Sequence, residues 1–512
     1  MHCLVLLLGA KCWIAAGSKQ MLCELPVLRI FLISCTAGML LTLTCGCGGG
    51  NPEFSSNRVF AARLSSEIGE PLSREGITEV QQLLEQAFGT PNLPLVPGSV
   101  PGTLVSIDAI RRAAGPVYSD EKDVHYGLYR KHCIRCHGVT GDGLGPAAKL
   151  LEPYPRDFRL GKFKYKSTPI GTKPTRHDLA RILKSGIPGT SMPSFRTLKD
   201  EDVEALVDYV VYLSVRGETE RALLSQLAFD FDNDPAAWFV DVDCAQQESP
   251  QKEEHALESE VRHGSGSVTR SLERLNELVV FNYLKWEVPS PEQPQRPSDM
   301  PVGELYTIQN ARPVVKQDLT PRLASELSDS ILRGAELFSG KLASCSQCHG
   351  VHGDGRIGTS VGSEIQDYDD WTKDWTIAAG IVPEDRVSLE PLIKAGALKP
   401  SPISARNLQY GIFRGGNLPE DLYRRIVDGI EGTPMPAAAL QPDVTVGLTE
   451  RQVWDLVNYC LNLKFRPRTG TAQVLDAEVF RSQQDQSPGD RASNEAKVTS
   501  KSEDASRSGR DS

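Results

Sequence analysis

Methionine is scarce in this chain, because only six of its 512 residues are Met and three of those lie in the first 50. The sequence also lacks a recognisable Ser/His/Asp set, a phosphate-binding loop and a pair of carboxylates at catalytic spacing. The net charge of −10 is too small to suggest a nucleic-acid partner. These absences leave no signal for hydrolytic or phosphoryl-transfer chemistry and none for nucleic-acid binding.

Cysteine is present but unevenly distributed, with six of the twelve residues in the first 47. The other six form two close pairs and leave two over: Cys133 and Cys136, Cys345 and Cys348, and Cys244 and Cys460. An exported protein can form a disulfide between the last two. The alternative is a free thiol at Cys460, which falls on a helix position that is expected to be buried.

The first 50 residues have the layout of an export signal. Arg29 precedes an apolar run over 30–44, and its 15 residues are fewer than the roughly 20 that span a membrane. A small-residue break from Cys45 to Gly50 follows. Cys47 after Gly46 resembles the lipobox of bacterial lipoproteins. We therefore expect an exported protein on the periplasmic side, anchored at its N-terminus by a lipid or an uncleaved leader, with a simple cleaved signal as the alternative.

Composition and periodicity divide the rest of the chain into segments. The predicted segments are a leader at 1–50, a helical and Pro-rich extension at 51–117, a first domain at 118–216, a helical and Pro-rich connector at 217–325, a second domain at 326–465 and a disordered tail at 466–512. Within the extension, apolar spacing predicts a helix from Ser73 to Phe88. The connector shows helical patterns over 222–229 and 268–286.

The two domains are an internal repeat that shares three blocks in the same order. The first block is Cys-x-x-Cys-His-Gly-Val-x-Gly-Asp-Gly, beginning at Cys133 and again at Cys345. The second is Gly-Ile-x-Gly-Thr-x-Met-Pro, beginning at Gly186 and again at Gly429. A closing helix with matching apolar positions ends both copies. Both copies are therefore expected to have the same fold.

Cys-x-x-Cys-His is the attachment signature of c-type haem. Its two thiols can each add to a vinyl group of the porphyrin, and the adjacent histidine is placed to bind the iron. The predicted attachment and proximal residues are Cys133, Cys136 and His137 in the first domain and Cys345, Cys348 and His349 in the second. A zinc site, a CxxC redox pair and a structural disulfide are the alternatives. Zinc needs four convergent ligands, and a redox pair is expected beside a βαβ pattern that is missing here.

Scarcity of methionine identifies the other axial ligands. Beyond the leader the chain has only Met192, Met300 and Met435, and the first and last occupy the same place in the two repeats. A Gly- and Pro-rich loop between two helices exposes each of them. We predict that Met192 and Met435 bind the irons, a pairing with histidine that raises the reduction potential. Met300, in the proline run, is not expected to be a ligand.

With these motifs the sequence resembles the class I cytochromes c over roughly 240 of its 512 residues. The resemblance implies a mainly α protein with two all-α haem domains and two covalently bound haem c groups. It also implies two aromatic pairs between the first and last helices of each domain: Tyr129 with Tyr209, and Phe338 with Tyr459. The family turns a backbone carbonyl toward the proximal histidine. Gly145-Pro146 resembles that element in the first repeat, whereas the second has Gly358-Thr359.

The copies differ in the distance between their predicted axial ligands. His137 and Met192 are 55 residues apart, whereas His349 and Met435 are 86 apart. The extra length lies mainly in 367–402 and contains Trp371 and Trp375. Such an insertion can cover a haem edge or meet a partner, and the Trp pair can equally form a small core of its own.

An iron with both axial positions filled cannot bind a substrate without losing a ligand. The sequence therefore favours an electron carrier rather than an enzyme, exchanging single electrons with redox proteins on the outer face of the cytoplasmic membrane. The tandem layout is similar to cytochrome subunits of bacterial respiratory oxidoreductases and terminal oxidases. One alternative is a dihaem cytochrome c peroxidase, which needs an iron that opens to peroxide. Another is a haem relay for a catalytic segment at 217–320.

Charge is distributed unevenly between the repeats. Between Tyr126 and Lys184 there are 13 Lys or Arg and four Asp or Glu, a balance of +9. Between Glu364 and Glu390 the balance is −6, from two basic and eight acidic residues. Surface charge of one sign steers encounters. We expect the first haem to meet an acidic redox partner, and the acidic insertion to meet a basic one or to dock near the first haem.

Overall fold

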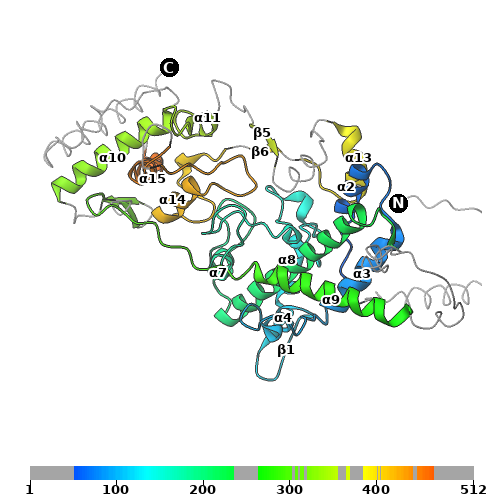
Figure 1. Cartoon of the computed structure of the whole chain (residues 1–512). Helices are drawn as coiled ribbons and strands as arrows, with labels where there is room; N and C mark the ends of the chain where they lie inside the picture. The colour runs from blue at the N-terminus through cyan, green and yellow to red at the C-terminus, as the bar shows by residue number, and fades with distance from the viewer. Residues whose placement is uncertain are drawn as a thin grey trace, which may run out of the picture. The chain divides into compact units, whose positions relative to one another are not determined.

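The structure is a computed structural model that describes residues 51–235, 263–301, 306–309, 312–315, 320–355, 365–368, 385–400, 402–403, 405–441 and 447–465. The described residues are mainly helical, with three two-stranded antiparallel pairs (Figure 1). The mainly α prediction is thus confirmed. The leader, the tail, Cys244, Gly358-Thr359 and the Trp371/Trp375 pair lie outside the described residues. Within the described residues, no helix has the length and apolarity that a membrane crossing requires.

The N-terminal extension consists of three helices, α2 (Arg58–Ile68), α3 (Arg74–Phe88) and α4 (Ile107–Ala113). Helix α3 matches the helix predicted from Ser73 to Phe88. The Ser73 side chain caps its first turn by accepting from Gly76 N, and Gly89 ends it. Its buried residues include Val80, Leu84 and Phe88, so the predicted apolar face packs into the core.

The first domain begins with a short hairpin and ends in a long helix. Its elements are β1 (Tyr118–Ser119), β2 (His125–Tyr126), α5 (Leu128–His132), α6 (Ile134–His137), the 3₁₀ turns η1 (Ala148–Leu150) and η2 (Phe158–Leu160), α7 (Arg176–Ser185) and α8 (Asp200–Phe229). The Tyr129 and Tyr209 rings lie 4.9 Å apart between α5 and α8. The predicted aromatic contact is therefore present.

Helix α8 is longer than the closing helix expected from the repeat. It has 30 residues and includes 222–229, so the predicted boundary at 216/217 falls inside it. Most of its residues are buried around its whole circumference, because α2, α3, α4, α7 and α9 all contact it. In its C-terminal third, Glu220 is fully buried and accepts hydrogen bonds from Asn57 N and the Gln81 side chain, both at 2.7 Å. This network holds the N-terminal extension on the first domain.

The connector contributes α9 (His263–Leu284), which packs against α8 and α3. The proline run after it lies on the second domain, where Trp454 Nε1 donates to Gln295 O at 2.8 Å. Met300 at its end is 5% exposed in the core of that domain. The end of the predicted Pro-rich connector thus supplies part of the second core.

The second domain repeats the helices of the first. Its elements are β3 (Tyr306–Gln309), β4 (Arg312–Val315), α10 (Pro321–Ser339), α11 (Ser346–His349), β5 (Ile365–Tyr368), α13 (Arg386–Lys394), β6 (Pro402–Ile403), η5 (Leu408–Tyr410), α14 (Pro419–Val427), α15 (Glu450–Asn462) and η6 (Leu463–Phe465). Helices α10 and α15 cross, with the Phe338 and Tyr459 rings 5.1 Å apart. The second predicted aromatic contact is therefore present as well. The predicted start of this domain at 326 falls inside α10.

The described part of the insertion is closed at its base by the pairing of β5 with β6. Its helix α13 contacts α2 of the N-terminal extension and buries Leu389 and Leu392 there. Leu144 and Leu160 of the first domain pack against the same small cluster. This segment of the insertion is therefore in contact with the first domain.

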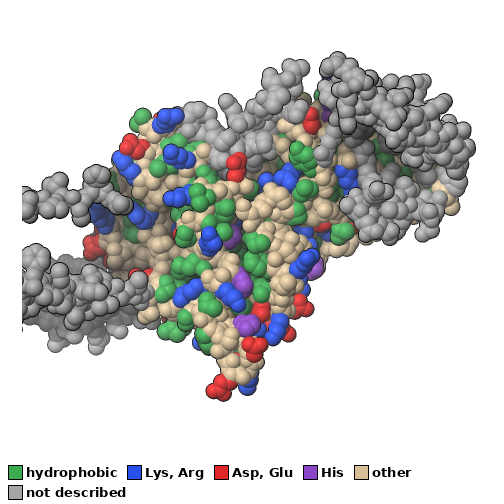
Figure 2. Space-filling model, turned by 180° about the vertical axis from the view of Figure 1, so that it is seen from behind, with side chains coloured by type: hydrophobic (Ala, Val, Ile, Leu, Met, Phe, Trp, Pro, Cys, Tyr) green, Lys and Arg blue, Asp and Glu red, His purple; other side chains and the backbone are tan. Residues whose placement is uncertain are grey.

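Part of the basic excess of the first domain is buried in ion pairs. Lys166 is 3% exposed and pairs with Glu431, and Arg159 pairs with Asp157 at 2.8 Å. Other Lys and Arg side chains reach the surface, and on the face in Figure 2 they are spread among acidic and uncharged side chains. The surface charge is thus smaller than the sequence count suggests.

Candidate haem sites

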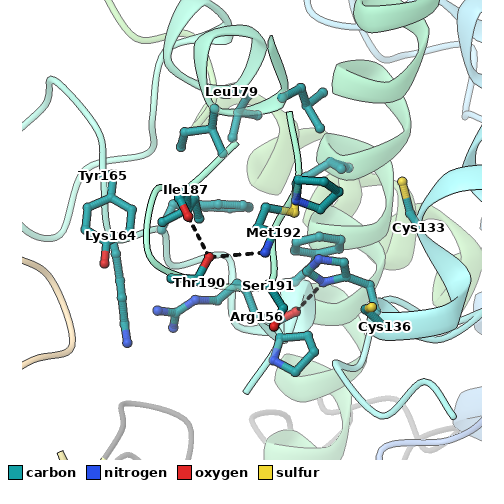
Figure 3. Close-up of a pocket in the computed structure, with 18 of the residues that line it drawn as sticks. Cys133, Cys136, Arg156, Lys164, Tyr165, Leu179, Ile187, Thr190, Ser191 and Met192 are labelled. Carbon is teal, nitrogen blue, oxygen red and sulfur yellow. Dashed lines mark hydrogen bonds between the residues drawn. The ribbon is translucent and has the colours of Figure 1, made fainter. Parts of the chain in front are cut away.

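Each repeat encloses a cavity lined by its predicted attachment and ligand residues. Cys133, Cys136, His137 and Met192 all line one cavity in the first domain (Figure 3). In the second domain, cavities of about 560 and 150 Å³ have Cys345, His349 and Met435 among their shared lining residues, and Cys348 lines the larger one. The structure thus brings together every residue predicted for each haem.

Backbone geometry presents the thiols and the histidine on one turn. Cys133 ends α5 and precedes α6, and His137 N donates to Cys133 O at 2.9 Å. Gly138 then reverses the chain with a φ of 73°. The Tyr129 hydroxyl donates to Gly138 O at 2.9 Å, which ties the attachment turn to the helix before it.

The predicted attachment cysteines are free thiols, of which Cys133 is buried, Cys136 and Cys345 are half-buried and Cys348 is exposed. Burial raises the pKa of Cys133 to about 12 and that of Cys345 to about 11. A CxxC redox pair acts through a thiolate of low pKa, which neither Cys133 nor Cys345 has in these surroundings. Among the described residues, no three His, Cys, Asp or Glu side chains converge as a metal site. Cys136 and Cys348 are more exposed than their partners, which places one side of each site near solvent.

Both proximal histidines are held in the tautomer that a metal ligand needs. His137 Nδ1 donates to Arg156 O at 3.1 Å, and His349 Nδ1 donates to Arg406 O at 3.1 Å. The other ring nitrogen, Nε2, is left with its lone pair. Burial lowers the pKa of His137 to about 4 and lowers that of His349, so both rings are neutral at neutral pH. Phe158 stacks on the His137 ring at 4.5 Å and fixes its plane.

The source of this carbonyl corrects a sequence expectation. Gly145-Pro146 was expected to face the proximal histidine, but the acceptor is Arg156, 19 residues after His137. Arg156 and Arg406 each begin a fourth repeated block, Arg-x-x-x-x-Gly-x-Phe, that sequence reasoning missed. The conserved spacing between copies was the available signal. A backbone carbonyl carries no side-chain signature, so the repeat alone could have identified it.

The methionine loops of the two repeats have the same hydrogen bonds. In the first, Met192 N donates to Thr190 Oγ1 at 3.1 Å, and that hydroxyl donates to Ile187 O at 2.8 Å (Figure 3). In the second, Met435 N donates to Thr433 Oγ1 at 3.2 Å, and Thr433 Oγ1 donates to Ile430 O at 2.9 Å. The Gly-Thr-x-Met spacing thus encodes a rigid loop that sets the position of each methionine.

A glycine starts each loop because no side chain fits there. Gly186 and Gly429 have φ values of 66° and 67°. A Cβ on Gly186 would lie 2.8 Å from Met192 O, and one on Gly429 would lie 2.8 Å from Met435 O. Each glycine therefore lets the chain close back onto the methionine.

The chemistry of these residues fits a haem group. Each cavity offers a neutral imidazole with a free Nε2, a thioether on a fixed loop and two thiols on one turn. The rest of the first cavity is largely apolar, with Phe163, Leu183, Phe195 and Val207 among its lining residues. Cys460 lines the second cavity as a free, buried thiol, and Met300 lies in the core. Haem is a large apolar ring with an iron that accepts N and S ligands, so the site suits it.

These sites define a haem-binding protein of the c type. Residues 122–210 match the family model "Cytochrome C oxidase, cbb3-type, subunit III", and residues 331–464 match the model "Cytochrome c". The chain therefore carries two cytochrome c domains in tandem and is an electron-transfer haem protein with haem c iron. The sequence resemblance is confirmed by both matches.

Two further comparisons give little beyond this. None of the curated proteins compared with the chain matches it significantly. Among solved structures, a chain of the reducing HAO-like protein complex from Kuenenia stuttgartiensis matches with 22% identity and a TM-score of 0.35. The match covers 66% of this chain and 94% of that one.

Proposed function

We propose that the chain is a dihaem electron carrier with one covalently bound haem c in each domain. Cys133, Cys136, Cys345 and Cys348 would attach the two groups. His137 with Met192, and His349 with Met435, would fill the axial positions. The observation that carries the proposal is the repetition of the whole donor set, down to the carbonyl behind each histidine and the hydrogen bonds of each methionine loop.

The protein's own residues keep the site closed and rigid. When bound, haem supplies a one-electron Fe(III)/Fe(II) couple. The Arg156 and Arg406 carbonyls hold the imidazoles in one tautomer, and the Thr190 and Thr433 hydroxyls hold the methionine loops. Apolar side chains form most of the walls of both cavities. A site whose donors are already in place needs little rearrangement when an electron arrives, which suits a carrier.

A pyridine haemochrome assay with intact-mass analysis tests the proposal. We expect two haems per chain, both retained after denaturation because they are covalently bound. Replacing Cys133 and Cys136 with Ala should remove one haem and leave the other. A wild-type chain with one haem or none would contradict the proposal. High-spin ferric signals with rapid peroxide turnover would instead support a dihaem peroxidase.

We further propose that the carrier is exported and works on the outer face of the cytoplasmic membrane, within a respiratory chain. Support comes from the leader, in which an apolar run over 30–44 precedes Cys47. Intact-mass analysis of membrane-extracted protein should show a new N-terminus at Cys47 carrying diacylglycerol. A soluble product that starts at another residue would contradict lipid attachment. A product found only inside the cytoplasm would contradict export.

A further inference from the structure

The two haem domains contact each other through equivalent parts of the repeat. Arg181 of α7 donates to Gly415 O of the second domain and, at 3.1 Å, to Tyr165 O of its own domain. Its counterpart in the repeat, Arg424 of α14, donates to Ser167 O at 2.6 Å. The segments that accept these bonds follow the same repeated block, whose glycines are Gly161 and Gly411. The contact thus resembles an isologous interface, in which the same surface is used on both sides.

One side chain of this interface lies in the walls of both cavities. Tyr165 lines the first cavity together with Met192 and the second together with Met435. Its side chain is 8% exposed. The second domain has Gly415 at the equivalent position, and a Cβ there would lie 2.8 Å from the Tyr165 Cβ. This close approach is possible because residue 415 has no side chain.

Arginines of the second domain surround this tyrosine. Burial raises the pKa of Tyr165 and nearby Arg414 lowers it, and the Arg425 guanidinium lies 5.9 Å from the centre of the Tyr165 ring. Arg406, whose carbonyl orients His349, packs its guanidinium on Gly189 in the first methionine loop. Arg406, Arg414 and Arg425 all line the second cavity. Tyr165 and these three arginines form what we name the shared wall.

The shared wall has buried hydrogen-bond donors without acceptors. Arg425 is 9% exposed, and its Nη1 donates to Lys166 O at 2.9 Å. Its Nε and Nη2, and the Nε of Arg414, are buried with no hydrogen-bond partner among the described residues. Burial lowers the pKa of Arg425, and neighbouring Arg181 lowers it further. A buried cation with unsatisfied donors is costly unless an anion accompanies it.

We propose that Arg414 and Arg425 bind a carboxylate of the haem in the second site, and that Tyr165 contacts the haems of both sites. This inference rests on the proposed function, since it requires a haem in each domain. Haem carries two carboxylates, and a guanidinium fork binds a carboxylate through two parallel hydrogen bonds. Compensating that negative charge favours the reduced iron, so the arginines raise the potential of the second haem. Tyr165 couples the surroundings of the two sites.

Redox titration of the full-length dihaem protein tests the arginines. Arg425→Gln should leave the carboxylate uncompensated and lower the ferrous-to-ferric ratio of the second haem about tenfold at a fixed potential, which is 59 mV for one electron. The first haem should keep its potential, and Arg425→Lys should restore part of the loss. Arg451→Gln is the matched control, because that exposed arginine of the same domain pairs with Asp299 and Glu326. If Arg425→Gln does not fold, Arg414→Gln takes its place.

The haem spectra test the tyrosine. Tyr165→Leu should change the Soret circular dichroism or the shifted NMR signals of both haems. Phe195→Leu should change those of the first haem, and Phe338→Leu those of the second, because each lines the cavity of its own domain. The proposal would be overturned if the potential of the second haem stays unchanged in both arginine variants. It would also be overturned if Tyr165→Leu alters the spectrum of only one haem. A wild-type chain without two haems would instead overturn the proposed function.

Discussion

At the residue scale, the proposed axial ligands are two histidines and two methionines, and burial keeps the histidine rings neutral. A solvent-exposed histidine titrates near pH 6.5, whereas His137 has its pKa lowered to about 4 because its charged form would be desolvated. The protonated ring can donate to Arg156 O as well as the neutral ring can, and this hydrogen bond raises the pKa of His137. The backbone carbonyl therefore does not keep the ring neutral. Desolvation does, and it leaves Nε2 available to a metal at neutral pH.

The methionines can be tested one at a time. Met192→Ala and Met435→Ala should each lower the potential of one haem, because the thioether favours ferrous iron, and should open that iron to carbon monoxide or cyanide. Optical redox titration with and without carbon monoxide measures both effects. Met300→Leu is the control. It replaces a core methionine by a residue of similar volume, so it should cost less than about 1.5 kcal/mol in stability and leave both potentials unchanged.

A variant of Met192 or Met435 that keeps the wild-type spectrum and potential would show that this methionine is not a ligand. Each substitution should act on the haem of its own domain, because Met192 lines the first cavity and Met435 lines the second. The pair of variants also assigns the two potentials to the two domains, which the titration of the shared wall requires.

At the scale of the element, the methionine loop depends on its first glycine. Gly186→Ala and Gly429→Ala should each displace the loop, because the added Cβ would meet backbone atoms 2.7 Å away in addition to the strain of a positive φ. We expect a loss of about 1–3 kcal/mol in stability and a partial loss of methionine ligation at that haem. Denaturant unfolding measures the loss of stability. The red absorbance band of methionine-ligated haem measures the loss of ligation.

Gly171→Ala separates strain from collision. Gly171 has a φ of 86° but nothing within 4 Å of an added Cβ. It should therefore cost some stability and leave ligation intact. If Gly186→Ala behaves like Gly171→Ala in both measurements, the close approach to Met192 O does not position the loop.

The repeat made most elements of the haem domains predictable from the sequence. The helix after Ser73 has clear apolar periodicity and both of its end signals, and the closing helices were identified because their apolar positions match. The length of α8 was not predictable in this way. A helix buried on every side has no polar stripe to define its register or its end, and the predicted domain boundary at 216/217 fell beside Gly217. The structure shows why a glycine is there, because an added Cβ would lie 2.3 Å from Arg159.

The candidate sites were predictable as far as side chains carry the chemistry. Cys-x-x-Cys-His and Gly-x-x-Gly-Thr-x-Met-Pro named all eight residues that the structure gathers around the cavities. The Arg156 and Arg406 carbonyls were not found, because any residue supplies a carbonyl. The shared wall was not visible either. Tyr165 and Arg425 are 260 residues apart in the sequence, and only the packing of the two domains brings them together.

At the scale of the whole molecule, net charge and local charge have opposite signs. The chain carries −10, yet the first haem domain has an excess of basic residues. Some of that excess is buried, as in the Lys166–Glu431 pair, so it contributes little outside the protein. Lys131 and Arg135 are exposed beside Cys133 and Cys136.

Kinetics with small redox reagents can show which of the two charges governs encounters at the first haem. If local charge governs, oxidation by anionic hexacyanoferrate(III) should slow as ionic strength rises from about 0.01 to 0.15 M, where the Debye length falls from about 30 to 8 Å. The cationic oxidant hexaammineruthenium(III) should show the reverse trend, because salt then screens a repulsion.

Stopped-flow phases are assigned to the first haem with the Met192→Ala variant. Lys131→Glu with Arg135→Glu should slow the anionic reagent and leave the haem spectrum unchanged, and Lys131→Glu alone should do so to a smaller extent. Lys394→Glu, the same change of charge as Lys131→Glu at an exposed residue of α13, should have little effect. If the rates follow the net charge of −10 instead, with the anionic reagent accelerated by salt, the basic surface does not steer partners to the first haem.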